Sequence, residues 1–119
     1  MKVAIPVLEK VINCKRLINP HFGKSDWFAL IDISTGETEL KENPALHLER
    51  GRGRFIADMF YREGVKAVLV KEMGPGAFEK ITNLGMEIYL IPREIKFVND
   101  ALELFKEGKL DRLTEPNER

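Results

Sequence analysis

The sequence contains one cysteine, Cys14, two histidines and one tryptophan among 119 residues. A single cysteine cannot form an intramolecular disulfide, which excludes the class of small secreted domains that disulfides hold together. The first residues, MKVAIPVLEK, lack the apolar segment and the small-residue cleavage site of a signal peptide. These absences predict a cytoplasmic protein.

Long apolar runs and an excess of either charge are also missing. Apolar runs such as 3–8 and 65–70 are far shorter than the roughly 20 residues that cross a bilayer. Acidic and basic residues number 19 each, so the formal net charge is zero. Because such a chain has no overall field to attract nucleic acid or an anionic membrane, we expect neither as a partner. Any bound anion must be held by a local cluster of cations.

What the sequence does contain is the pattern of an α/β domain. Strands are expected at Val3–Val7, Trp27–Ile33, Glu37–Lys41, Val65–Val70 and Met86–Ile91, and amphipathic helices after residues 54, 76 and 96. Proline should end the first strand at Pro6, which leaves residues 8–26 as a long loop. The order predicts a three-layer mixed sheet of about five strands with helices on both faces. Residues 1–110 are expected to form one domain, followed by a frayed polar tail at 111–119.

Two glycine-containing segments could hold an anion. Lys71–Gly76 follows a strand and opens a helix, where Gly74 and Gly76 let the backbone approach a ligand and helix amides favour negative charge. The other interpretation is a plain tight turn. The run Arg50–Arg54 places Arg52 and two further guanidinium groups beside a helix start, where cations suggest a nearby anion. A solvated basic loop explains that run equally well.

The predicted long loop carries the residues with metal-ligand chemistry. Cys14 and His21 offer a thiolate and an imidazole, ligands that suit iron-sulfur and similar metals, and Lys24 adds a positive charge. Cys14 could also be a semi-buried small residue, and His21 a hydrogen-bonded structural one. His47 precedes the basic run and could face the same edge of the sheet.

Catalytic motifs are absent from the sequence. It contains no Gly-x-Ser-x-Gly and no His-Glu-x-x-His. Asp26, Asp32 and Asp58 would have to converge to support metal-dependent nuclease chemistry. We therefore expect a protein that is not an enzyme.

Three segments together resemble a known family: residues 1–7, Pro20-His21-Phe22-Gly23-Lys24 with the aromatic pair that follows, and 64–70 leading into Gly74-Pro75-Gly76-Ala77-Phe78. They are similar to the dinitrogenase iron-molybdenum cofactor biosynthesis domain family, and the likeness covers the chain to about Leu110. The resemblance implies a ribonuclease H-like fold without nuclease chemistry. It also implies binding or carrying of an iron-sulfur or iron-molybdenum-type cofactor or its precursor during metallocluster biogenesis.

Site roles follow from the residues and the resemblance together. His21 is the expected metal ligand with Cys14 as a second, Lys24 and Arg52 are charge partners, and Gly74 and Gly76 supply the close-approach backbone. The partners would be a metallocluster donor or acceptor protein, and the chain itself a monomer or homodimer. An alternative hypothesis is a regulatory or scaffold module that binds a small anion or a partner protein without metal.

Overall fold

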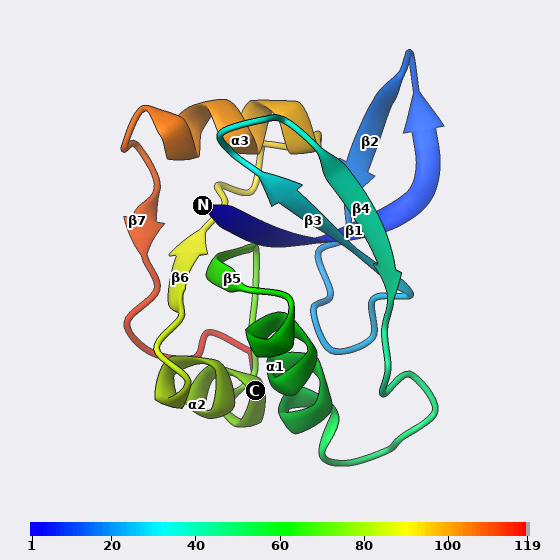
Figure 1. Cartoon of the computed structure of the whole chain (residues 1–119), viewed down its shortest axis with the longest axis vertical. Coiled ribbons are helices and arrows are strands. Elements are labelled where there is room, and N and C mark those ends of the chain that lie inside the picture. The colour runs from blue at the N-terminus through cyan, green and yellow to red at the C-terminus, as the bar shows by residue number, and fades with distance from the viewer. Residues whose placement is uncertain (119) are drawn as a thin grey trace.

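The computed structural model describes residues 1–118, and its elements are arranged in a single mixed sheet with helices on both sides (Figure 1). In chain order they are β1 (Lys2–Ile12), β2 (Lys15–Ile18), β3 (Trp27–Asp32), β4 (Thr38–Glu42), α1 (Arg52–Arg62), β5 (Val65–Val70), α2 (Pro75–Asn83), β6 (Glu87–Leu90), α3 (Val98–Lys106) and β7 (Asp111–Arg112).

The sheet has the strand order β4-β3-β1-β5-β6-β7, and β2 pairs with the outer part of β1. Its centre is parallel, because β1 pairs with β5 and β5 with β6 in the same direction. The outer strands β4, β3 and β7 run antiparallel to their neighbours. The predicted three-layer α/β class is confirmed, with seven strands in place of about five.

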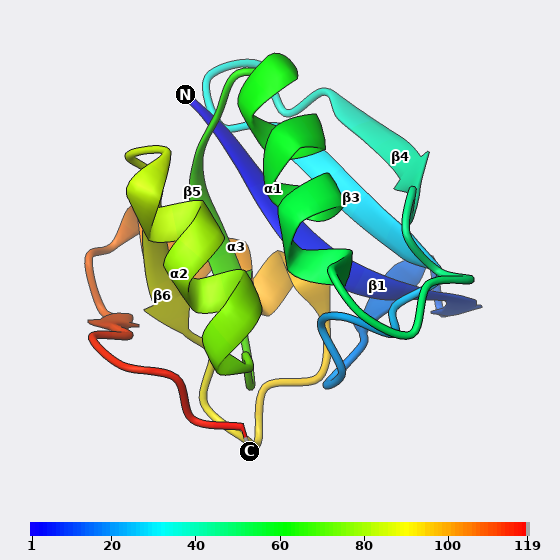
Figure 2. The ribbon, with the colours of Figure 1, turned by 90° about the horizontal axis from the view of Figure 1, so that it is seen from below.

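Helices α1 and α2 lie side by side on one face of the sheet and α3 covers the other (Figure 2). Each face of the sheet has its own hydrophobic core, because successive side chains of a strand point to opposite faces. Ala4 faces the α1 and α2 side, whereas Val3 and Ile5 face α3. On α1 the buried residues include Ile56, Met59 and Phe60, as the helical period predicts. Phe55, which the same pattern assigned to this face, is 47% exposed because it lies at the edge of the buried stripe.

The expected loop at 8–26 is wrong in its first half, since β1 continues to Ile12 and returns as β2. Asn13 and Cys14 form the turn, with φ of 52° and 62°, the left-handed geometry of a two-residue hairpin. Pro6 does not end β1 because on one side it pairs with Phe28 of β3. On the other side the register passes from β5, last paired at Ala4, to β2, first paired at Val7. A residue in that gap needs no amide donor.

The C-terminal segment is also ordered, where a frayed tail was expected. After β7, Leu113 is buried and its amide donates to the Ile88 carbonyl at 2.8 Å. The Asn117 amide donates to the Met73 carbonyl at 3.1 Å. Residues 111–118 therefore pack along β6 and the end of β5, while residue 119 lies outside the described residues.

The starts of α1 and α2 touch at one glycine. A methyl group added at Gly53 would lie 2.6 Å from the Ala77 Cα and 2.8 Å from its nitrogen. Only glycine allows this approach, which places the first turns of both helices next to each other. Among residues 1–118, no helix combines the length and apolar character needed to span a bilayer.

Candidate functional site

A depression of about 390 Å³ opens at the edge of the sheet where β5 ends and α1 begins. It is lined by His21, Gly23, Lys24, Arg52, Glu72 and Glu118. The structure thus brings together His21, Lys24 and Arg52, three of the four side chains that the sequence assigned to one site; the fourth, Cys14, lies elsewhere. Glu72 belongs to the Lys71–Gly76 segment that was expected at the site, whereas Glu118 was not expected there.

The loop after β2 displays His21 by burying its neighbour. Phe22 is 2% exposed and packs against Phe28, with ring centroids 5.3 Å apart, and against Phe60 at 6.1 Å. The His21 side chain is 64% exposed. The buried Phe22 ring holds the loop against the core, and its neighbour His21 is thereby held at the surface.

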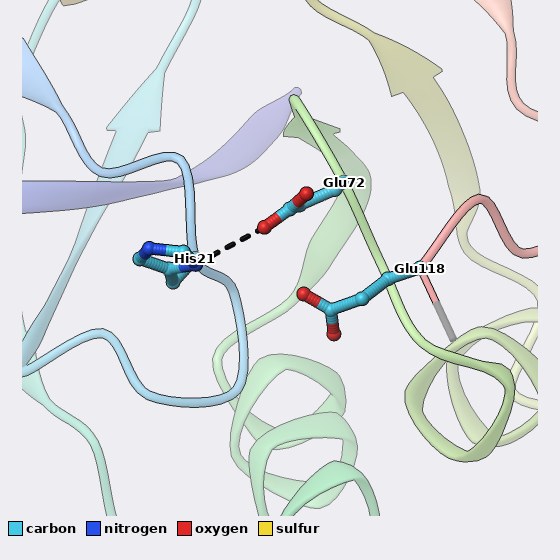
Figure 3. A group of neighbouring side chains, drawn as sticks. All are labelled: His21, Glu72 and Glu118. Carbon is cyan, nitrogen blue, oxygen red and sulfur yellow. Dashed lines mark hydrogen bonds and ion pairs between the residues drawn. The ribbon is translucent and has the colours of Figure 1, made fainter.

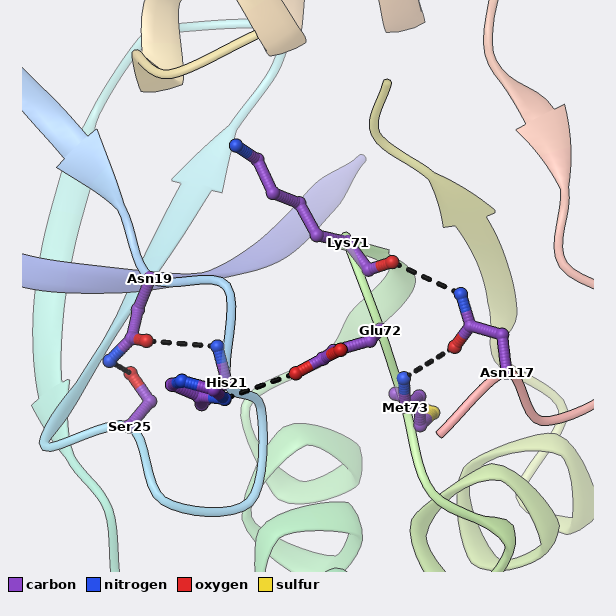
Figure 4. A network of polar contacts seen from close by, with 7 residues as sticks. All are labelled: Asn19, His21, Ser25, Lys71, Glu72, Met73 and Asn117. Carbon is purple, nitrogen blue, oxygen red and sulfur yellow. Dashed lines mark hydrogen bonds and ion pairs between the residues drawn. The ribbon is translucent and has the colours of Figure 1, made fainter. Parts of the chain in front are cut away.

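Buried polar side chains fix the path of this loop (Figure 4). The Asn19 Oδ1 accepts the His21 backbone amide at 2.9 Å, and the Asn19 Nδ2 donates to the Ser25 Oγ at 3.3 Å. The Asn43 Nδ2 donates to the carbonyls of Gly23 and Ser25 at 3.0 and 2.9 Å. These bonds satisfy buried backbone groups and hold His21 and Lys24 at fixed positions.

His21 is oriented by a carboxylate from the far side of the depression. Its Nδ1 lies 3.0 Å from the Glu72 Oε1, and Glu118 approaches the same pair from the C-terminal segment (Figure 3). One donor atom from each of His21, Glu72 and Glu118 lies within 4.8 Å of the others. A nitrogen and two oxygens in this arrangement are a donor set that Zn²⁺ or Fe²⁺ accepts.

Two helix starts add amide dipoles to the same edge. Gly51 and Gly74 are the N-cap residues of α1 and α2, and within the described chain no side chain caps either helix. Neither first turn contains an acidic residue. The Arg52 Nε is buried and has no hydrogen-bond partner in residues 1–118. Uncapped amides and an unpaired guanidinium donor fit an anion such as a sulfide-rich cluster.

The two predicted glycines differ in their surroundings. A methyl group on Gly74 would lie 3.4 Å from the Glu118 Oε1, so the space beside this glycine is taken by the C-terminal segment. At Gly76 nothing lies within 4 Å of that position. Gly76 follows Pro75 in the first turn of α2 and faces open space. Gly76 leaves the backbone exposed, Gly74 is partly covered, and neither glycine lines the depression itself.

Cys14 and His47 are not part of this group. Cys14 is exposed in the turn of the β1–β2 hairpin and does not line the depression. His47 lines a different hollow with Glu9, Asp26 and Trp27. The structure therefore gives Cys14 no contact with the other expected ligands, and the hypothesis of a Cys14–His21 ligand pair has no geometric support.

The three aspartates considered for nuclease chemistry do not converge. Asp32 lines a hollow beside Lys2, Asp26 lines the hollow of His47, and Asp58 lines one between α1 and α2. Two-metal chemistry places two ions about 3.5–4 Å apart, so the carboxylates that hold them must converge on one site. The structure gives no support to a nuclease site built on them.

The two glutamates shape the charge of the depression. Burial raises the pKa of the Glu118 carboxyl, the Glu72 carboxyl raises it further, and His21 and Lys24 partly offset the effect. Lys71 contributes its charge elsewhere, since its Nζ donates to the Arg93 carbonyl at 3.3 Å. Burial lowers the pKa of Lys71, and the neighbouring Lys96 lowers it further. The charges that face the depression are thus Lys24 and Arg52 against Glu72 and Glu118.

Glu118→Gln should stabilise the protein slightly at neutral pH. A raised carboxyl pKa means that the folded state binds the proton more tightly, so this group favours folding below its ordinary pKa and loses that effect as the pH rises through the folded value. Gln mimics the protonated form. We expect the variant to exceed the wild type by at most about 0.5 kcal/mol at pH 7 and to match it near pH 3. Urea titrations of both proteins, with a chelator present to keep them metal-free, give the two free energies of unfolding. A variant that is less stable than the wild type at pH 7 would contradict the prediction.

These features define a small α/β protein with a charged depression at the carboxyl edge of its mixed sheet, lined by an imidazole, two cations and two carboxylates. Open sheets of this kind commonly bind ligands at that edge. Residues 1–108 match the family described as dinitrogenase iron-molybdenum cofactor. The chain therefore belongs to this family, which is involved in iron-molybdenum cofactor biosynthesis. The resemblance in the histidine loop and the glycine turn is confirmed.

Individual relatives agree with this membership. The chain is 33% identical to the uncharacterized protein MJ0580 of Methanocaldococcus jannaschii over 94% of its own length and 91% of the relative. It shares 26% identity and a TM-score of 0.81 with the solution structure of a NifB-like protein from Thermotoga, over 99% and 97% of the two chains. The fold also matches the apo form of the orange protein from Desulfovibrio gigas, with a TM-score of 0.86 at 24% identity over 98% and 96%.

Proposed function

We propose that this protein binds and carries an iron-sulfur or iron-molybdenum-type cofactor, or a precursor of one, without catalysing a reaction. The observation that supports it most is the meeting of His21, Lys24 and Arg52 at one depression beside two uncapped helix starts. A metal-sulfur cluster is polarizable and often negatively charged, so fixed cations, amide dipoles and one soft ligand suit it.

His21 is proposed as the metal ligand through its Nε2. The Glu72 carboxylate lies 3.0 Å from Nδ1 and accepts a hydrogen bond from its N–H, which leaves the Nε2 lone pair free to bind a metal. Histidine ligands in metalloproteins commonly donate their second nitrogen to a carboxylate in this way. The high exposure of the ring leaves room for a guest larger than a single ion.

Lys24 and Arg52 are proposed to neutralise the sulfide charge, with the amides near Gly74 and Gly76 contributing partial positive charge. The Arg52 Nε is the buried donor that a bound anion would satisfy. A guest held by one side-chain ligand and by charge can be released intact, as a carrier requires. We propose a cluster donor or acceptor protein as the partner, in the cytoplasm.

Anaerobic reconstitution with iron and sulfide tests this function. The wild-type protein should acquire a visible absorption band that survives desalting. A colourless product would count against the proposal. Binding of sulfate or phosphate with no response to iron would instead favour a module that binds a small anion without metal.

Arg52→Gln should weaken binding of the reconstituted cluster about three- to tenfold, since it removes one charge and the buried Nε donor. Arg54→Gln is the matched control: it removes the same charge two residues further along α1, where Arg54 lines a hollow with Asp58 and Lys80. Titration of each apoprotein with iron and sulfide, followed by absorbance, gives the comparison. Equal affinities of the two variants would contradict the role of Arg52.

A further inference from the structure

The last residues of the described chain lie outside the family match, yet they reach the candidate site. The match ends at residue 108. Beyond it, Leu113–Glu118, which we term the C-terminal strap, crosses the end of β5 and delivers the Glu118 carboxylate to the depression (Figure 3). The strap therefore brings a side chain from beyond the family match to the site.

The strap is fixed at two points. At its start Leu113 is buried and bonded to Ile88. At its end the Asn117 Oδ1 accepts the Met73 amide at 2.7 Å and the Asn117 Nδ2 donates to the Lys71 carbonyl at 3.1 Å (Figure 4). The backbone amides of Asn117 and Glu118 both donate to the Met73 carbonyl, at 3.1 and 3.2 Å. These bonds hold the backbone of Glu118 beside the depression while they persist.

The end of the strap, at residues 117 and 118, is held by hydrogen bonds alone. Thr114, Glu115 and Pro116 are exposed, and Asn117 itself is at the surface. Opening the end of the strap therefore uncovers little apolar area and exchanges hydrogen bonds with the protein for hydrogen bonds with water. Segments of this kind open locally far more readily than the fold as a whole.

The carboxylate lines the depression that an anionic guest would enter. Glu118 shares the depression with His21, Lys24 and Arg52, and its Oε1 occupies the space beside Gly74. Its charge interacts favourably with His21 and Lys24 and unfavourably with Glu72. The positive groups of the depression thus already face a negative one, which belongs to the chain itself.

We propose that Glu118 is a tethered competitor: the closed strap holds its carboxylate at the depression that also carries Lys24 and Arg52, and an anionic guest binds by displacing it. The inference rests on the proposed function, because it assumes that the guest is anionic and enters this depression. A partner that holds the strap open would favour loading, and closure of the strap would favour release.

Binding of tetrathiomolybdate, a dianionic molybdenum-sulfide probe, tests the inference at low ionic strength, where charge effects are least screened. Three full-length proteins are compared: wild type, Glu118→Gln, and Glu115→Gln, which removes the same charge from an exposed position of the strap. We expect Glu118→Gln to bind about three- to tenfold more tightly than wild type. Glu115→Gln should match the wild type.

The outcomes separate the inference from the function on which it rests. Unchanged or weaker binding by Glu118→Gln, with normal binding by wild type, would overturn the competitor and leave the function intact; weaker binding would mark Glu118 as a ligand. No binding by any of the three proteins would overturn both. Asn117→Ala provides a second test. Faster amide hydrogen exchange at residue 118 would show that the strap is released, and this variant should then also bind tetrathiomolybdate more tightly than the wild type. Unchanged affinity in the released variant would overturn the proposal that the strap holds Glu118 in competition with the guest.

Discussion

Gly53→Ala is expected to lower the free energy of unfolding by about 1–3 kcal/mol, although alanine is the better helix former. The added methyl group would meet backbone atoms of Ala77 at 2.6 and 2.8 Å, which a side-chain rotation cannot relieve. The starts of α1 and α2 must then separate. Thermal unfolding followed by circular dichroism should show a fall of about 5–10 °C in the melting temperature.

Gly76→Ala is the matched control for this substitution. Gly76 also lies in the first turn of a helix, but nothing stands within 4 Å of its missing methyl group. We expect its stability to stay within about 0.5 kcal/mol of wild type. Equal stabilities of the two variants would show that the close contact between the helices does not exist in solution. The same separation should weaken guest binding in Gly53→Ala, because it would shift the start of α1, and with it Arg52, relative to the other residues of the depression.

The second large effect is expected at His21. His21→Ala should weaken binding of the reconstituted cluster at least tenfold, because even loss of the group behind a metal-ligating histidine commonly costs tenfold or more. His47→Ala is the control, since this imidazole lines another hollow. Anaerobic titration monitored at the visible band gives both affinities. If His47→Ala lost the visible band and His21→Ala kept it, the assignment of His21 as the metal ligand would be wrong.

Much of the fold could be predicted because the buried strands carry a strong pattern. Val65–Val70 coincides with β5, and the turn, helix and closing glycine after it follow as expected for half of a parallel unit. The β1–β2 hairpin could not be predicted in the same way. The β1 residues beyond Val7 are exposed, so no alternation of apolar and polar residues marks them as a strand. The Asn13-Cys14 turn is the one local signal, and Pro6 argued against it.

The candidate site was predicted on one side only. His21, Lys24 and Arg52 carry recognisable chemistry, and the topology brings the loops that hold them to one edge. Glu72 and Glu118 carry no motif, and their positions depend on tertiary contacts. Glu118 in particular is placed by hydrogen bonds from Asn117 to the backbone around Met73, 44 residues away in sequence. A polar segment without periodicity gives no sign of such long-range bonds, which is why a frayed tail was the natural expectation.

The central claim is that an anionic metal-sulfur guest binds at the rim where His21, Arg52 and the two helix starts meet. Titration of ¹⁵N-labelled protein with tetrathiomolybdate tests it residue by residue, through changes in amide chemical shift. The largest changes should fall at Gly23, at the first turns of α1 and α2, and at Glu118, while the Asn13-Cys14 turn and α3 stay unchanged. Changes centred on Cys14, or an unchanged spectrum at saturating probe, would contradict it.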